Sequence, residues 1–278
     1  MTTLTQEQIN WLNKCTKDGT YRRTPGTWTL NPKTGLVDVD GGFNCSHQRL
    51  KGFKGVKFGK VEDSFRCDDN QLTSLVGAPL KVGGEFYCYT NQLTSLEGAP
   101  QSVGENFCCN DNQLTSLVGA PQKVGEDFYC DNNRLTSLVG APRRVGGYFS
   151  CSYNQLTTLV GAPQKVGDDF WCDNNRLTSL EGAPLKVGNY LYCGNNRLTS
   201  LEGAPLKVGG EFWCEANPVS AKTLVTIFDK MREGDSFLSA AASLRKEMSE
   251  EEWKLIATNI PETIRPGVSM LARFGVFG

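Results

Sequence analysis

Hydrophobic positions recur at a fixed interval along most of the chain. Cysteines stand at 45, 67, 88, 109, 130, 151, 172, 193 and 214; the first step is 22 residues and the other seven are 21 each. Phe or Leu stands two positions before each of them, and Leu follows at plus five and plus eight. The repeating unit reads V-G-x-x-F-x-C-x-x-N-x-L-T-S-L-x-G-A-P-x-x. Such a period predicts a solenoid in which each copy forms one turn.

The pattern within one copy predicts its local structure. Phe and Cys alternate with one other residue, so they lie on the same side of a short strand, and stacked copies bury that side. The Asn after the strand can bond to backbone groups of neighbouring turns. The Gly-Ala-Pro segment is too tight and too poor in donors for a standard helix. We therefore expect extended or 3₁₀-like returns.

The two ends of the chain depart from the repeat. Residues 1–42 begin with a capping box, Thr5 and Gln8, and continue with two alternating runs around 31–35, which predict a helix and a hairpin. Residues 43–219 hold about nine repeats. Residues 220–278 contain a second capping box, Ser249 and Glu252, and predict helices. We expect these ends to cap the solenoid; an effector or dimerisation module is the alternative for 220–278.

Composition narrows the function classes. Lys plus Arg is 29 and Asp plus Glu is 30, a formal net charge of −1, which makes no case for direct nucleic-acid binding or for binding to an anionic membrane. No apolar run is long enough to span a bilayer, and no secretory signal is visible at the start. These features favour a cytoplasmic protein. His47 is the one histidine, which excludes sites built from several imidazoles.

No two of the eleven cysteines have the C-x-x-C spacing that is typical of zinc ligands. We therefore expect no metal and no cofactor, and free thiols that behave as small core residues. Disulfides between repeat cysteines of neighbouring copies remain an alternative. Cys108 falls at an outward position and is expected to be a reactive exposed thiol or a tolerated variant.

The stretch F-x-C-x-x-N-x-L-x-x-L resembles the leucine-rich repeat pattern. The run NQLTSL at 91–96 and 112–117 is similar to the short repeats of secreted bacterial ubiquitin-ligase effectors, and more so to cysteine-containing leucine-rich repeat proteins of bacteriophage and bacterial genomes. The resemblance covers about residues 43–219. It implies a curved solenoid with a parallel sheet on its concave side that holds another macromolecule. The catalytic domain of the effector ligases has no counterpart of sufficient length after Asn217. Gln48 and Phe53 in the first copy, and Pro218 after the last, depart from the pattern.

Function is expected where outward positions vary between copies. In the column between Phe and Cys, five of nine residues are Tyr or Trp, and the columns on either side are rich in carboxylates. The lysines and arginines lie outside these columns, in the segment after the repeat Pro and directly after the repeat Asn. Tyr and Trp are enriched at binding hot spots. The candidate partner-binding residues are Tyr87, Tyr129, Trp171, Tyr192, Trp213, Tyr148, Tyr190, Glu85, Asp127, Asp169, Glu211, Asp131, Asp173 and Glu215.

These observations predict a non-enzymatic scaffold that grips a protein with a basic surface in an acidic, aromatic concave face. By analogy, the resemblance also suggests that the protein is a phage inhibitor of a host or defence protein. Four alternatives stay open: a solvated sheet without a partner, a nucleic-acid mimic that blocks a DNA- or RNA-binding enzyme, a structural virion protein, and an enzyme that works through paired carboxylates. The oligomeric state is left open.

Overall fold

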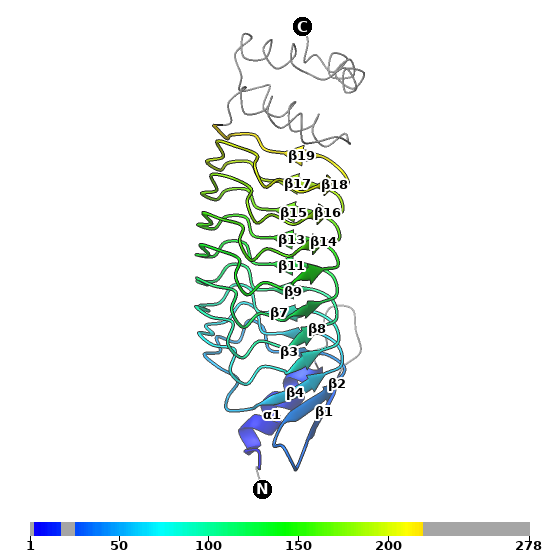
Figure 1. Cartoon of the computed structure of the whole chain (residues 1–278). Coiled ribbons are helices and arrows are strands. Elements are labelled where there is room, and N and C mark those ends of the chain that lie inside the picture. The colour runs from blue at the N-terminus through cyan, green and yellow to red at the C-terminus, as the bar shows by residue number, and fades with distance from the viewer. Residues whose placement is uncertain (1–2, 18–25, 219–278) are drawn as a thin grey trace, which may run out of the picture. The chain divides into compact units, whose positions relative to one another are not determined.

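The computed structural model describes residues 3–17 and 26–218. The chain divides into two compact units, Met1–Leu135 with Val139–Gly147, and Thr136–Leu138 with Tyr148–Gly278. Within each unit, successive 21-residue copies form successive turns of a parallel β-solenoid (Figure 1). The predicted solenoid fold is therefore confirmed. The helices predicted in 220–278 lie outside the described residues.

The Phe-x-Cys segments form a parallel sheet in each unit, here called the Phe sheet. In the first unit its strands are β3 (Phe43–Asn44), β5 (Phe65–Arg66), β7 (Phe86–Tyr87), β9 (Phe107–Cys108) and β11 (Phe128–Tyr129). In the second unit they are β13 (Phe149–Ser150), β15 (Phe170–Trp171), β17 (Leu191–Tyr192) and β19 (Phe212–Trp213). Equivalent residues of successive copies pair directly, as Phe86 does with Phe107 and Phe170 with Leu191. Each outward column is therefore a straight row across the sheet.

A second parallel sheet, which the sequence analysis does not predict, is made by the Lys-Val segments after each Pro. In the first unit this Lys sheet contains β4 (Phe58–Val61), β6 (Lys81–Val82), β8 (Ser102–Val103), β10 (Lys123–Val124) and β12 (Arg144–Val145). In the second unit it contains β14 (Lys165–Val166), β16 (Lys186–Val187) and β18 (Lys207–Val208). The Val of each strand faces inward and the preceding residue faces out. The returns are thus extended, and none of the described residues is in a 3₁₀-helix.

The N-terminal segment packs against the first turn of the first unit. Helix α1 (Gln6–Lys17) begins with the predicted capping box, in which Thr5 N–H donates to Gln8 Oε1 at 2.9 Å and Gln8 N–H to Thr5 Oγ1 at 3.3 Å. The predicted hairpin is also present, as β1 (Thr27–Leu30) antiparallel to β2 (Val37–Asp40), and it extends the Lys sheet. The Trp11 ring packs edge-on against Phe43, at 5.4 Å between ring centres. No helix in the described residues is both long and apolar enough to cross a membrane.

Columns of identical apolar side chains form the core between the two sheets. The rings of Phe65, Phe86 and Phe107 stack at 5.7 and 5.6 Å, within 8° of parallel. The Leu pairs and the cysteines of the repeat are buried beside them. Each buried Phe contributes about 2 kcal/mol relative to an exposed one. Because one copy cannot cover this surface, stability comes from stacking.

The repeat Asn forms the hydrogen-bond ladder expected of it. In the second unit, Asn175 Oδ1 accepts from Leu156 N–H at 2.9 Å. Its Nδ2 donates to the carbonyls of Cys151, Cys172 and Asp173, at 3.0, 3.2 and 3.1 Å. One amide thus satisfies buried backbone groups of two turns that have no helix or wide sheet to satisfy them.

Candidate functional site

The outward face of the Phe sheet carries the candidate residues, and each unit has its own part of it. The first-unit face holds Glu85, Tyr87, Asp127, Tyr129 and Asp131. The second-unit face holds Tyr148, Asp169, Trp171, Asp173, Tyr190, Tyr192, Glu211, Trp213 and Glu215. Most of these side chains are half-buried, because neighbours in adjacent turns cover their sides.

Arg66 occupies a built site on the first-unit face. Its Nε and one terminal nitrogen donate to the two oxygens of Asp68, at 3.1 and 3.2 Å, and that nitrogen also lies 3.2 Å from Tyr89 Oη. The guanidinium carbon lies 5.1 Å from the centre of the Tyr87 ring in the next turn. Burial alone would lower the pKa of Arg66, but the hydrogen bonds and charges of Asp68 and Tyr89 leave it raised. A paired carboxylate and two tyrosines thus hold one guanidinium.

Arg66, Asp68 and Tyr89 are not among the partner-binding residues predicted from the sequence, although all three stand in outward columns. The spacing of these residues in the sequence could have indicated the site. In an extended strand Arg66 and Asp68 point to the same side, and Tyr87 and Tyr89 stand at the same two positions one copy later. The Asp68 carboxylate is fully buried, so its pairing with Arg66 offsets a large desolvation cost.

Cys108 was expected to be an exposed outward thiol, and that expectation is wrong: only 7% of the residue is exposed. It lies between Tyr87 and Tyr129, which pair with it on the two neighbouring strands. Two large rings on either side of a small residue cover it. Burial raises the pKa of the Cys108 thiol well above its ordinary value, and nearby Cys109, Glu85 and Asp127 add to the effect. The burial expected of the repeat cysteines is confirmed, and Cys15 is buried as well.

Two carboxylates of the first-unit face contact its tyrosines. Tyr129 Oη donates to Asp127 Oδ2 at 3.1 Å. Burial raises the pKa of the Tyr87 hydroxyl, and a hydrogen bond with Glu85 adds to this. Both rings are therefore oriented by acids of their own strands.

The second-unit face gathers five aromatic side chains. Trp171 lies edge-on to Tyr192 at 5.5 Å between ring centres, and Tyr148 and Tyr190 extend the group at 6.5 Å from Trp171 and 6.0 Å from Tyr192. Trp213 pairs with Tyr192 across β17 and β19. Trp171 is 41% exposed, an unusual value for so large an apolar side chain. These residues form one aromatic row.

Asp169 positions this row instead of facing solvent. It is 5% exposed, its Oδ1 accepts from Tyr190 N–H at 2.9 Å, and its Oδ2 accepts from Trp171 Nε1–H at 3.3 Å. Burial raises the pKa of the Asp169 carboxyl, although both hydrogen bonds act in the opposite direction. Asp169 therefore fixes the indole.

The remaining acids of the second-unit face differ in their surroundings. Asp173 accepts hydrogen bonds from the Ser152 hydroxyl and from Asn174 Nδ2. Glu215 packs over Gly194, and its Oε2 is buried without a hydrogen-bond partner in the described part of the chain. Glu211 is exposed. The exposed carboxylate of Glu211 is thus open to an external donor, whereas the unpartnered oxygen of Glu215 is buried.

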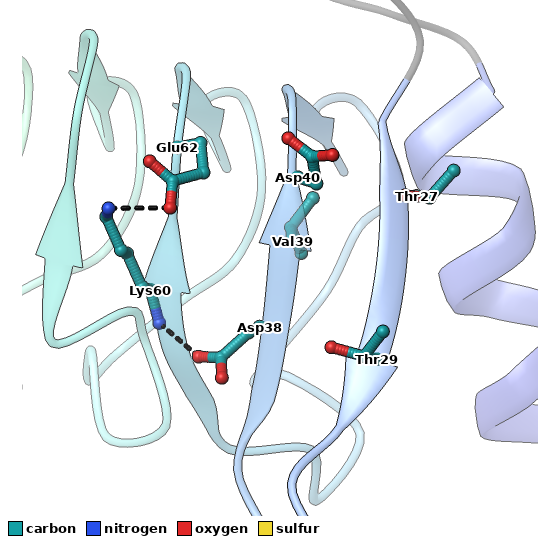
Figure 2. A pocket seen from close by; sticks show the side chains of 7 residues that line it. All are labelled: Thr27, Thr29, Asp38, Val39, Asp40, Lys60 and Glu62. Atoms are coloured by element: carbon teal, nitrogen blue, oxygen red, sulfur yellow. Dashed lines mark hydrogen bonds and ion pairs between the residues drawn. The ribbon is translucent and has the colours of Figure 1, made fainter.

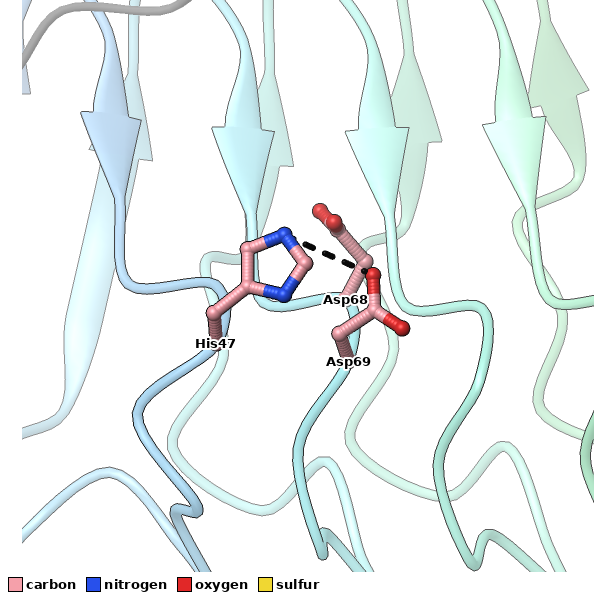
Figure 3. A group of neighbouring side chains, drawn as sticks. All are labelled: His47, Asp68 and Asp69. Carbon is pink, nitrogen blue, oxygen red and sulfur yellow. Dashed lines mark ion pairs between the residues drawn. The ribbon is translucent and has the colours of Figure 1, made fainter.

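One group of side chains has the composition of a metal site (Figure 3). Atoms of His47, Asp68 and Asp69 lie within 4.8 Å of one another, and His47 Nε2 is 3.6 Å from Asp69 Oδ2. Both oxygens of Asp68, however, are bound by Arg66. A cation here would have to compete with the guanidinium, so the group fits an ion pair better than a metal centre.

Comparisons with known proteins give limited matches. No family model matches the sequence, and no curated protein matches it. Among solved structures, the chain is similar to YopM, a leucine-rich effector protein from Yersinia pestis, with a TM-score of 0.46 and 21% identity over 63% of this chain and 49% of that one. It is also similar to YopM from Yersinia enterocolitica WA-314, with a TM-score of 0.41 and 16% identity over 77% of this chain and 51% of that one. The chain spans about half the length of these structures.

Proposed function

We propose that this protein is a non-enzymatic scaffold that binds a protein partner through the outward face of the Phe sheet, by taking arginine side chains of the partner between its aromatic rings and carboxylates. The observation that supports this most is Arg66. The face already binds one guanidinium of its own chain, through a bidentate carboxylate and a tyrosine ring 5.1 Å away.

The second-unit face repeats the aromatic and acidic components without a cation. None of its residues directly before Phe or Leu, between Phe and Cys, or after Cys is Lys or Arg. Trp171, Tyr192 and Trp213 stand at equivalent positions of three consecutive strands, and the carboxylate of Glu211, which precedes the last of these strands, is exposed. An external guanidinium would supply the missing charge. Contacts of this kind contribute about 0.5–2 kcal/mol each, depending on how far they are desolvated.

The partner therefore carries arginines on an exposed surface. Tyr129 and Asp131 of the first-unit face, and the acids Glu85 and Asp127 that orient its rings, would take part in the same way. The repeats resemble those of bacteriophage proteins, and this resemblance extends the proposal: the protein would act in the cytoplasm as a phage inhibitor of a host or defence protein. A nucleic-acid mimic would use the same carboxylates but would not need the rings.

The experiment is fluorescence anisotropy with two labelled probes, an arginine-glycine repeat peptide and the same peptide with citrulline in place of arginine. Citrulline keeps the shape and removes the charge. The proposal predicts saturable binding of the arginine peptide that Trp171→Ala and Trp213→Ala each weaken by about 2 kcal/mol at unchanged fold. The replacement of Lys123, Arg144 and Lys165 by Gln is the control and should have little effect.

Equal binding of both peptides, or binding that survives the tryptophan changes, would contradict the proposal. If binding fails only after removal of Glu211 and Glu215 and is indifferent to the rings, the nucleic-acid mimic becomes the better account.

A further inference from the structure

The outward column of the Lys sheet is a row of cations. In the second unit, Lys165 pairs with Lys186 and Lys186 with Lys207 on consecutive parallel strands. All three side chains are exposed. Neighbouring strands lie about 4.8 Å apart, so the positive charges repeat at roughly that interval along a line.

Such a row is electrostatically unfavourable by itself. Like charges directly opposite each other destabilise a sheet. None of the three lysines has an ion pair within the described residues. Lys60, in the same column of the first unit, shows what could neutralise them: its Nζ lies 2.6 Å from Glu62 Oε1, two residues further along the strand (Figure 2).

Every later copy has Gly at the position of Glu62. The reason is steric, because a Cβ on Gly188 would lie 1.8 Å from the carbonyl oxygen of Gly167, and one on Gly209 would lie 2.0 Å from that of Gly188. A side chain at the position of Glu62 is therefore excluded from the lysine-bearing turns. The exposed glycines leave a strip of backbone without side chains beside the lysines.

The first unit has a similar row. Lys81 pairs with Ser102 and Ser102 with Lys123, and Arg144 follows on the next strand. Here too the adjacent outward positions are glycines, Gly83, Gly104 and Gly125, each with the same close carbonyl contact. Both units of the chain thus carry the same arrangement.

We propose that the Lys sheet binds the phosphate backbone of a nucleic acid. A linear polyanion matches a line of unneutralised cations, and the flat glycine strip lets its backbone approach closely. The column contains no aromatic residue on which a base could stack, and the glycines provide no side chain to read a base edge. Binding therefore depends on phosphate contacts and not on base sequence. The net charge of −1 is an average over the whole chain and does not reveal this row of cations. The proposal does not depend on the function proposed above.

The test is anisotropy of a labelled, mixed-sequence single-stranded oligonucleotide with the full chain, titrated between about 50 and 200 mM salt. The variant Lys165→Gln/Lys186→Gln/Lys207→Gln removes the second-unit row. The matched control Arg134→Gln/Arg176→Gln/Arg197→Gln removes the same charge from exposed positions outside the Lys sheet. Thermal unfolding midpoints of both variants are measured to check that each variant folds.

The proposal predicts at least a tenfold loss of affinity in the lysine variant at the lowest salt. The slope of log affinity against log salt should fall by about 2, since each phosphate contact on a single strand contributes about 0.7. The arginine control should bind within about twofold of the unchanged protein. Equal losses in both variants, no loss in either, or equal binding of poly-glutamate would each overturn the proposal.

Discussion

The guanidinium carbon of Arg66 lies 5.1 Å from the centre of the Tyr87 ring, one turn further along the stack. The same guanidinium neutralises Asp68, whose side chain is fully buried. The two contacts define the chemistry of the outward face: it accepts a planar cation between an aromatic ring and a carboxylate. They also make Arg66 a structural residue of the first unit.

Arg66→Ala should lower the free energy of unfolding by about 3 kcal/mol, because it leaves the buried Asp68 carboxylate without its partner. Urea denaturation measures this loss. The double variant Arg66→Ala/Asp68→Ala should recover part of it, since no charge then remains buried. If the double variant is as unstable as the sum of its two single changes, the pair is not coupled.

Asn112→Ala should cost about 3 kcal/mol, because the amide accepts from Leu93 N–H at 2.9 Å and donates to three backbone carbonyls. Asn112→Asp keeps the acceptor and loses the donors, so it should destabilise as well. Asn110→Ala, at an outward position two residues away, is the matched control and should change stability by less than about 1 kcal/mol. Equal effects at 110 and 112 would show that the ladder does not stabilise the turns.

Thr90→Asn should stabilise the protein by about 0.5–1 kcal/mol. Thr90 has φ +50, a left-handed conformation that a β-branched residue adopts with strain, and five of the other eight copies place Asp or Asn there. Thermal unfolding measures the gain. The control is Thr94→Asn, an exposed threonine of the same copy without a positive φ, which should produce no gain.

Thiol labelling of the native protein should be slow at all cysteines of the Phe sheet, Cys108 included. Burial raises the pKa of thiols such as Cys88 and Cys108, so little thiolate forms even in mildly alkaline buffer. Tyr87→Ala removes one of the two rings beside Cys108 and should speed its labelling alone. Mass spectrometry of the labelled peptides identifies the site, and fast labelling of Cys108 without the substitution would contradict its burial.

The period of the sequence is sufficient to predict the inward side of the Phe sheet and the Asn ladder, because those positions carry the same residue types in nearly every copy. The Lys sheet was missed because a two-residue Lys-Val strand between Pro and Gly has no recognisable alternation. The burial of Cys108 and Asp169 depends on which residues stand opposite them in neighbouring turns. Register makes Tyr87 and Tyr129 the neighbours of Cys108, and Asp169 is covered where it bonds Trp171 and the Tyr190 backbone. Those contacts follow only once the strands are paired and the rings are placed.

The proposed capture of arginine by the outward face can be read directly from the indole N–H signals of ¹⁵N-labelled protein, assigned by single Trp→Phe variants. During titration with the arginine-glycine peptide, the signals of Trp171 and Trp213 should move. Those of Trp11 and Trp28, whose indole N–H groups donate to Gln48 and Asn13, should stay in place. The citrulline peptide should move none of them. Unchanged Trp171 and Trp213 signals at saturating arginine peptide, or equal shifts with citrulline, would contradict the assignment of this face as the binding surface.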